Sequence, residues 1–231
     1  MSEYITVDVP EGSFRAYVAR PERDVAPAIV VLQEVFGVNS DMRAACDELA
    51  AAGFVAIAPD LFWRDEPELD LSHWTDSEWK KGLSLYETYD LDKGVHDVAA
   101  TIAAARSLDG TNGKVGLMGF CLGGLMTFLT TAREGNDAAV SYYGGATEKH
   151  LAEANGITVP MLMHFGEDDE FISKEAQAQI AAAVASNELV TVYSYPGCSH
   201  AFARHTGTRF DPGAAALANE RTRAFFKHTL S

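Results

Sequence analysis

The sequence predicts an α/β fold in which an open, mostly parallel sheet carries helices on both faces. Two observations lead to this prediction. Apolar runs of strand length alternate with stretches of helical periodicity, and the later runs are apolar at nearly every position rather than at every second one. Continuously apolar strands are typical of parallel sheets that are covered on both sides, because both faces of each strand are then buried.

Eight segments have strand character. They are residues 4–9, 14–19, 28–34, 54–59, 114–120, 138–144, 161–166 and 190–195. The first two are expected to form an antiparallel pair at the N-terminus, and the later ones to form the parallel part of the sheet.

Five segments between and after these strands have helical periodicity. They are residues 40–53, 91–108, 122–133, 173–186 and 211–230. We expect Ser40 to cap the first helix, which ends at Gly53, because serine caps helix N-termini well and glycine commonly ends helices. Asp211 and Pro212 are expected to begin the last helix.

Length and charge narrow the class of protein. The 231 residues contain no repeat, low-complexity segment or linker, so a single domain spanning residues 1–231 is expected. The 33 acidic and 18 basic residues give a formal charge of −15. This charge repels phosphate backbones and anionic lipids, so neither nucleic acid nor a membrane is an expected partner.

Nothing in the chain predicts export. The N-terminal region lacks the apolar segment of a signal peptide, and the chain has no apolar run long enough for a membrane span. The cysteines Cys46, Cys121 and Cys198 form no C-x-x-C pair, and an odd number cannot all form intramolecular disulfides. We therefore expect a cytoplasmic protein that is a monomer or a small homo-oligomer.

Residues 61–83 depart from the regular alternation and contain all three tryptophans, Trp63, Trp74 and Trp79. The segment follows a predicted strand, and open α/β sheets bind ligands beyond the carboxyl ends of their strands. The tryptophans could therefore wall a pocket, or they could only anchor an irregular segment to the sheet. The sequence leaves both possibilities open.

The segment Gly119-Phe120-Cys121-Leu122-Gly123 has the pattern G-x-C-x-G between a predicted strand and a predicted helix. The same pattern with serine is the nucleophile elbow, a tight turn that needs small neighbours and lifts a reactive side chain above the sheet. A sulfur at this position faces a helix N-terminus, which favours a thiolate. Cys121 is the expected nucleophile.

Asp169 and His200 are the expected partners of Cys121. Each follows a different predicted strand, and the order nucleophile, acid, histidine is that of α/β-hydrolases. Asp168 competes with Asp169, because a shift of one residue in the loop would exchange them. The G-x-x-D spacing before an apolar pair favours Asp169.

Two other histidines and a metal site are the alternatives to this triad. His164 lies within a predicted strand and is expected to be a core residue, while His205 follows His200 too far along the loop to replace it. The chain has no local pairing of ligands typical of structural zinc, so no metal or other cofactor is expected.

Around these residues the chain resembles the dienelactone hydrolases, α/β-hydrolases with a cysteine nucleophile. The resemblance runs through nearly the whole chain, in QEVFGVN (33–39), APDLF (58–62), YDLDKGVHDV (89–98), GKVGLMGFCLGG (113–124), SYYGG (141–145), GCSHAFAR (197–204) and AAALANERT (214–222). It implies the α/β-hydrolase fold and a carboxylic-ester hydrolase that needs no cofactor.

The resemblance also implies roles for further residues. Glu34 would accept the thiol proton of Cys121 when substrate binds. The backbone N–H groups of Leu122 and Val35 would form the oxyanion hole. Arg204 would bind a substrate carboxylate, and Tyr142 would line the pocket.

The chain departs from the family at the helix after the tryptophan-rich segment. The family usually has a second carboxylate-binding arginine there, whereas this chain has Trp79, with Lys80 or Lys81 as possible substitutes for the charge. An ammonium group lacks the bidentate geometry of a guanidinium. The expected substrate is a small anionic lactone or enol ester such as a dienelactone, and another small activated ester is the alternative substrate. The alternative functions are those of a non-catalytic binding protein or of a redox-sensing protein that uses Cys121 and Cys198.

Overall fold

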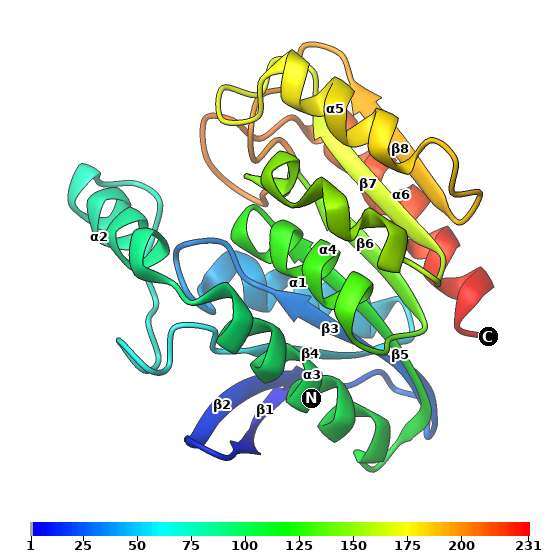
Figure 1. The fold of residues 1–231 in the computed structure, drawn as a ribbon. Coiled ribbons are helices and arrows are strands. Elements are labelled where there is room, and N and C mark those ends of the chain that lie inside the picture. The colour runs from blue at the N-terminus through cyan, green and yellow to red at the C-terminus, as the bar shows by residue number, and fades with distance from the viewer. Residues whose placement is uncertain (1) are drawn as a thin grey trace.

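The computed structural model describes residues 2–231, which form an eight-stranded sheet with helices on both faces (Figure 1). The strands are β1 (Ser2–Val9), β2 (Gly12–Ala19), β3 (Ala26–Leu32), β4 (Val55–Pro59), β5 (Thr111–Phe120), β6 (Ala138–Tyr142), β7 (Met161–Gly166) and β8 (Val190–Tyr195). Their order in the sheet is β1-β2-β4-β3-β5-β6-β7-β8.

The N-terminal strands are antiparallel and the rest of the sheet is parallel. β2 pairs antiparallel with both β1 and β4, and every pairing from β4 to β8 is parallel. The predicted α/β architecture, with its antiparallel pair at the N-terminus, is confirmed.

The helices form two layers. They are α1 (Ser40–Ala51), α2 (Asp76–Thr88), α3 (Leu91–Ser107), α4 (Leu122–Arg133), the 3₁₀ segment η1 (Thr147–Gly156), α5 (Lys174–Val184) and α6 (Pro212–Thr229). α1 and α6 cover one face of the sheet, while α3 and α4 cover the other, with η1 beside α4 and α5 beside η1 (Figure 1). α2 projects from the body of the molecule (Figure 1).

The helix starts agree with the sequence in one case and differ by one residue in another. Asp211 caps α6 as predicted, with its side chain accepting a hydrogen bond from the N–H of Ala214. The cap of α1 is Asn39 rather than Ser40, because the Asn39 side chain reaches the N–H of Met42. Both side chains satisfy N–H groups that have no acceptor within the helix.

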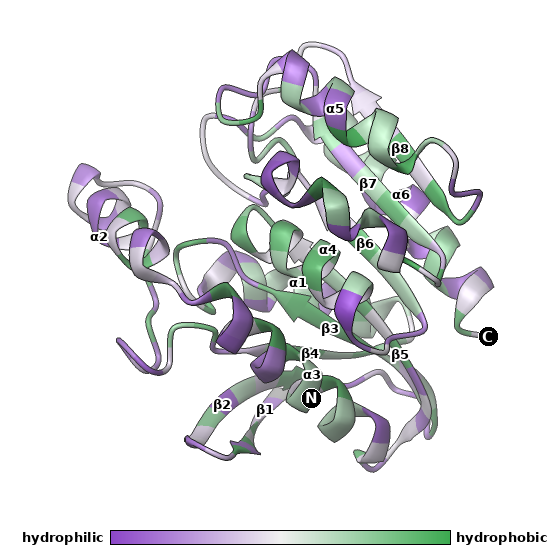
Figure 2. Ribbon diagram, in the orientation of Figure 1, coloured by the Kyte–Doolittle hydropathy of each residue, from purple (hydrophilic) through white to green (hydrophobic). Residues whose placement is uncertain are grey.

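The core follows the sheet. β4, β6 and β7 are buried at every position, which explains their continuously apolar sequences (Figure 2). α4 is also buried without interruption from Leu122 to Thr131, because it lies between the sheet and other helices. Because α4 is held on all sides, it is a rigid support for the turn that precedes it, at Cys121.

The parallel strands end at one edge of the sheet. Their register pairs Leu32 with Gly119, Phe120 with Tyr142 and Gly166 with Tyr195. The loops after β3, β5, β6, β7 and β8 are therefore neighbours, as is usual at the carboxyl edge of a parallel sheet.

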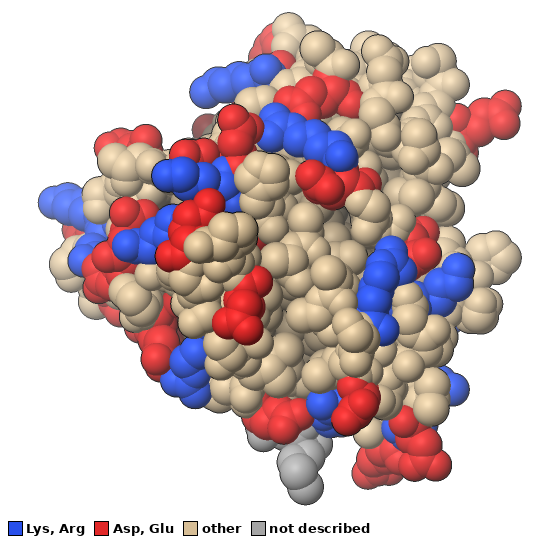
Figure 3. Space-filling view, turned by 60° about the horizontal axis from the view of Figure 1, so that its bottom comes forward, with Lys and Arg blue, Asp and Glu red and all other residues tan. Residues whose placement is uncertain are grey.

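The surface carries both signs of charge. On the face shown in Figure 3, basic side chains are scattered and many border acidic ones.

Within residues 2–231, none of the helices has the length and apolar character needed to cross a membrane.

Candidate active site

Cys121 lies at the turn between β5 and α4 in a strained backbone conformation. Its φ of 55° and ψ of −113° lie in a region that residues with side chains seldom adopt. Its N–H donates a hydrogen bond of 3.1 Å to the carbonyl of Tyr142 on the neighbouring strand. The sulfur is half-buried and lines a cavity.

Glycines allow this turn because backbone segments approach them closely. A Cβ atom on Gly119 would lie 2.0 Å from the carbonyl oxygen of Gly123. A Cβ atom on Gly123 would lie 2.2 Å from the carbonyl oxygen of Leu32. Both contacts are far shorter than van der Waals distance, so the two flanking glycines of the motif are required by packing against β3 and α4.

His200 and Asp169 form a buried pair beside Cys121. His200 Nδ1 lies 2.8 Å from Asp169 Oδ2. The other carboxylate oxygen, Asp169 Oδ1, accepts hydrogen bonds from the N–H groups of Phe171 and Ile172 at 2.8 and 3.0 Å. The Phe171 and Tyr143 rings contact the imidazole edge to face. These contacts hold the imidazole in one orientation, with Nδ1 on the carboxylate.

The surroundings of His200 raise its pKa. Burial by itself would lower the pKa, but the negative charge on the Cys121 sulfur and the hydrogen bonds to Asp169 and Cys121 outweigh burial and raise it to about 10. The imidazole is therefore held as a cation while the sulfur carries charge. Once Cys121 has lost its proton, thiolate and imidazolium form the ion pair that is typical of cysteine nucleophiles.

The competing acid and histidines lie elsewhere. Asp168 is exposed, with its carboxylate 3.4 Å from the ammonium of Lys174. His164 is buried in the sheet, where its ring nitrogens bond the hydroxyls of Tyr195 and Thr222 at 2.8 and 3.2 Å. His205 pairs with Glu48 at 3.0 Å. None of the three lines the cavity.

Glu34 and Arg204 form a second buried pair in the same cavity. Arg204 Nε donates a hydrogen bond of 2.8 Å to Glu34 Oε2, while Glu34 Oε1 is buried without a hydrogen-bond partner among the described residues. Burial would lower the pKa of Arg204, but the negative charge of Glu34 outweighs it and raises the pKa. The Arg204 guanidinium lies 5.2 Å from the ring centre of Phe36 and 5.8 Å from that of Trp79.

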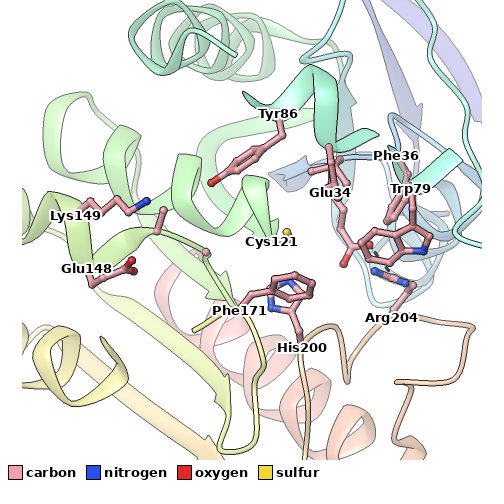
Figure 4. A pocket seen from close by; sticks show the side chains of 14 residues that line it. Glu34, Phe36, Trp79, Tyr86, Cys121, Glu148, Lys149, Phe171, His200 and Arg204 are labelled. Atoms are coloured by element: carbon pink, nitrogen blue, oxygen red, sulfur yellow. Dashed lines mark hydrogen bonds and ion pairs between the residues drawn. The ribbon is translucent and has the colours of Figure 1, made fainter. Parts of the chain in front are cut away.

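These groups share one cavity of about 210 Å³, with Cys121 near its centre (Figure 4). Glu34, Trp79 and Arg204 stand at one end, and Glu148 and Lys149 stand at the other (Figure 4). Val35 also lines the cavity. Leu122 is the first residue of α4, so its N–H has no acceptor within the helix.

The structure corrects two predicted positions. Tyr142 does not line this cavity, because its hydroxyl points to α6 and bonds Asn219 and Thr222. The next residue, Tyr143, lies beside His200 instead. Lys80 is exposed and does not line the cavity either.

Lys81, the other candidate for the missing positive charge, pairs with Glu66 and is likewise outside the cavity. No lysine of α2 therefore supplies a cation to the site.

The three tryptophans have separate roles. Trp79 lines the cavity and donates a hydrogen bond of 2.9 Å to the carbonyl of His73. Trp63 packs on Phe14 and bonds Asp97 with its indole N–H. Trp74 is 64% exposed. One tryptophan therefore walls the pocket, as one interpretation of residues 61–83 held, and another anchors the segment, as the other interpretation held.

Sequence reasoning missed several residues that line the cavity. They are Phe36, Leu83, Tyr86, Gly145, Ala146, Glu148, Lys149 and Phe171. The spacing of Trp79, Leu83 and Tyr86 places them on one face of a helix and could have revealed two of them. Glu148 and Lys149 follow β6 on η1, and no motif marks them.

The redox alternative finds no support in the geometry. Cys198 is buried and does not line the cavity, and burial raises the pKa of its thiol.

Within residues 2–231, no group of three His, Cys, Asp or Glu side chains is arranged to hold a metal ion.

The sheet order and the elbow between β5 and α4 define an α/β-hydrolase. A solved structure from Klebsiella pneumoniae, described as a candidate dienelactone hydrolase, matches it with a TM-score of 0.88 and 25% identity, covering 98% of both chains. The model of the dienelactone hydrolase family matches residues 14–230, and the chain belongs to this family. It is accordingly a hydrolase of ester bonds.

Two relatives match along nearly their whole length. A protein of Azospirillum brasilense, described as a candidate carboxymethylenebutenolidase, is 45% identical over 222 residues, covering 95% of both chains. The carboxymethylenebutenolidase of Pseudomonas putida is 37% identical over 222 residues, covering 96% of this chain and 94% of its own.

Proposed function

We propose that the chain opens a small anionic lactone or enol ester, such as a dienelactone, through a thioester on Cys121. The observation that carries this proposal is the shared cavity, in which a strained cysteine and the His200–Asp169 pair stand beside a buried arginine. The names of the relatives, carboxymethylenebutenolidases, agree with this substrate class.

Substrate binding activates the nucleophile. Arg204 is held by Glu34 in the free protein, and a substrate carboxylate competes for the same guanidinium. Glu34 then loses its only hydrogen-bond partner among the described residues and accepts the proton of the Cys121 thiol. The thiolate therefore forms where a substrate is present to receive it.

The thiolate attacks the ester carbonyl carbon, and the N–H groups of Leu122 and Val35 stabilise the oxyanion. Donors of this kind contribute about 3 kcal/mol each to lowering a barrier. The tetrahedral intermediate collapses to a thioester and expels an enolate. Water then attacks the thioester while His200, oriented by Asp169, accepts its proton and passes it to the enolate. The thiolate leaves and takes back the proton held by Glu34, which restores the free enzyme.

The leaving group narrows the substrate class. A thiolate is itself a good leaving group, so an intermediate carrying a poor alkoxide returns to reactants. An enolate or aryloxide leaves readily, which favours lactones of enols over ordinary alkyl esters and peptides. Another small activated ester remains the second candidate, because the same nucleophile and oxyanion donors would act on it.

The test compares an anionic dienelactone with its neutral methyl ester. We expect Arg204→Ala to lower kcat/KM for the anion by about a hundredfold, because a buried charged contact is lost, and to change the methyl ester far less. Arg204→Lys should retain part of the preference for the anion, since it keeps the charge but not the planar donors.

Circular dichroism and thermal unfolding would show that each variant is folded. An equal loss towards both esters in a folded Arg204→Ala variant would contradict the assigned carboxylate contact. Loss of all turnover in Cys121→Ala is required by the mechanism.

A further inference from the structure

A second guanidinium does not itself line the cavity but packs against two of the aromatic rings that do. Arg209, on the loop between β8 and α6, places its guanidinium carbon 5.3 Å from the ring centre of Trp79 and 5.6 Å from that of Phe171. Both rings line the cavity, and Phe171 is 53% exposed at its edge. Arg209 therefore lies directly beside two aromatic walls of the cavity.

Most of the Arg209 donors are free to bind a ligand. Nη2 pairs with Glu170 Oε1, whereas Nε and Nη1 have no hydrogen-bond partner among the residues that the structure describes. The Arg209 side chain is 32% exposed and that of Glu170 is 39% exposed. Ion pairs with this exposure contribute little to stability, so an incoming carboxylate can share or replace Glu170.

Arg204 and Arg209 occupy different depths beside the same indole. Arg204 is buried with Glu34 and lies 5.8 Å from the centre of Trp79, while Arg209 lies at the surface, 5.3 Å from it. A single carboxylate placed near Cys121 reaches the inner arginine. The outer arginine is left for an anionic group that projects toward solvent.

The opposite end of the cavity offers a less suitable place for an anion. Lys149 lines it, but Glu148 beside it has a buried carboxylate oxygen with no hydrogen-bond partner among the described residues (Figure 4). A second substrate carboxylate placed there would meet a like charge, which raises the cost of binding. On the arginine side, Glu34 also has one buried oxygen without such a partner, but its other oxygen accepts a hydrogen bond from Arg204, which offsets its charge.

We propose that Arg209 forms a second carboxylate subsite and that the preferred substrates are dicarboxylates, with one carboxylate on Arg204 and the other on Arg209. This proposal rests on the proposed function for the identity of the reacting ester, but not for the binding of the two carboxylates. The proposal assigns specificity for the second carboxylate to Arg209, a loop residue, rather than to a residue of α2. From α2, Trp79 supplies an aromatic wall of the cavity.

Binding of two non-reacting probes isolates the subsite. trans,trans-Muconate and sorbate are planar six-carbon dienes with two carboxylates and one carboxylate, and neither contains an ester. Isothermal titration calorimetry on the wild-type protein gives the ratio of their Kd values. We expect muconate to bind about tenfold more tightly, and Arg209→Ala to remove most of this preference while leaving sorbate binding unchanged.

Matched variants separate the subsite from general charge effects. Arg20→Ala removes an arginine of similar exposure, 29%, that pairs with Glu3 and does not line the cavity. Arg209→Ala also leaves Glu170 without its cationic partner, although Glu170 Oε2 still accepts a hydrogen bond of 3.2 Å from the N–H of His200. Glu170→Gln and the double variant Glu170→Gln/Arg209→Ala therefore repeat the comparison without that carboxylate. We expect Arg20→Ala and Glu170→Gln to keep the muconate preference, and the double variant to lose it.

Three results would overturn the proposal: no measurable muconate binding to the wild type, an unchanged preference in Arg209→Ala, or a preference that disappears in Lys149→Met instead. Turnover of the dienelactone pair is measured separately. A protein that binds muconate through Arg209 but hydrolyses no ester would contradict the proposed function alone.

Discussion

At the residue scale, the charge of the His200 imidazole depends on its two neighbours. Burial opposes the charged form, while the Cys121 sulfur and the Asp169 carboxylate favour it. The balance raises the pKa from 6.5 to about 10. Removing either neighbour takes away part of the stabilisation of the charged imidazole, so burial should then lower the pKa of His200.

We expect the pKa of His200 to fall below about 10 in Cys121→Ala and in Asp169→Asn. Cys121 contributes both a charge and a hydrogen bond, so its removal should have a large effect. The measurement is an NMR titration of the imidazole ring signals in the wild type and in the two variants. An unchanged His200 titration in both variants would show that neither group acts on it.

Some residues of the site can be predicted from the sequence because local chemistry distinguishes them. Asp169 accepts hydrogen bonds from two N–H groups of the turn that follows it, which is the physical reason that the spacing before Phe171 and Ile172 favours it over Asp168. The pair between Arg204 and Glu34 joins residues 170 positions apart, and no periodicity reveals it. The resemblance to the family located both residues but did not predict that they pair.

At the scale of an element, the elbow depends on close contact between β5, α4 and β3. Gly123 is the sharpest example, because a Cβ there meets backbone atoms of Leu32 and Gln33 rather than a movable side chain. The backbone of β3 could adapt only by shifting the loop that carries Glu34 and Val35. Packing of the elbow and placement of the oxyanion hole are thus linked.

We expect Gly123→Ala to destabilise the protein by about 3 kcal/mol, since its methyl group would overlap the β3 backbone. Urea unfolding followed by circular dichroism measures the change. Gly135→Ala is the matched control, because a Cβ there meets nothing within 4 Å. Equal midpoints for the two variants would contradict this packing.

α2 shows where sequence patterns are insufficient at this scale. Gly82 is its only buried residue, and apolar side chains such as those of Trp79 and Tyr86 are only partly buried, whereas α3 buries its apolar face in the core. Its position depends on a few contacts of Trp79 with Phe36 and with the carbonyl of His73. Those partners lie outside the helix and could not be identified in advance.

At the scale of the whole molecule, the strand and helix segments were predictable because each is long and buried. The order of strands was not, since the pairing of β2 with β4 joins segments about forty residues apart through backbone contacts that leave no local pattern. The buried network of His164, Tyr195, Thr222 and Tyr142 ties β6, β7 and β8 to α6. This network explains why the Tyr142 side chain points away from the cavity.

His164 should make the fold sensitive to acid. Burial, together with the charge of Arg221, lowers the pKa of His164 from 6.5 to about 3. Between these two pKa values the unfolded chain binds a proton at His164 and the folded chain does not. The free energy of unfolding is therefore not reduced by His164 above pH 6.5, and it falls as the pH drops from 6.5 toward 3.

We expect wild-type stability to fall by about 1 kcal/mol per pH unit more than that of His164→Gln between pH 6.5 and 4. Urea midpoints at several pH values measure the difference. His96→Gln, which removes an exposed histidine, should follow the wild type. Parallel curves for His164→Gln and the wild type would rule out this titration.

The identity of the nucleophile is tested by trapping the acyl group. The protein is mixed with an activated aryl ester, quenched in acid and mapped by mass spectrometry, with His200→Gln included to slow hydrolysis of the thioester. We expect one acyl group on the peptide that contains Cys121, accumulating in His200→Gln and absent from Cys121→Ala. An acyl group on another residue, or full turnover in Cys121→Ala, would contradict a thioester mechanism.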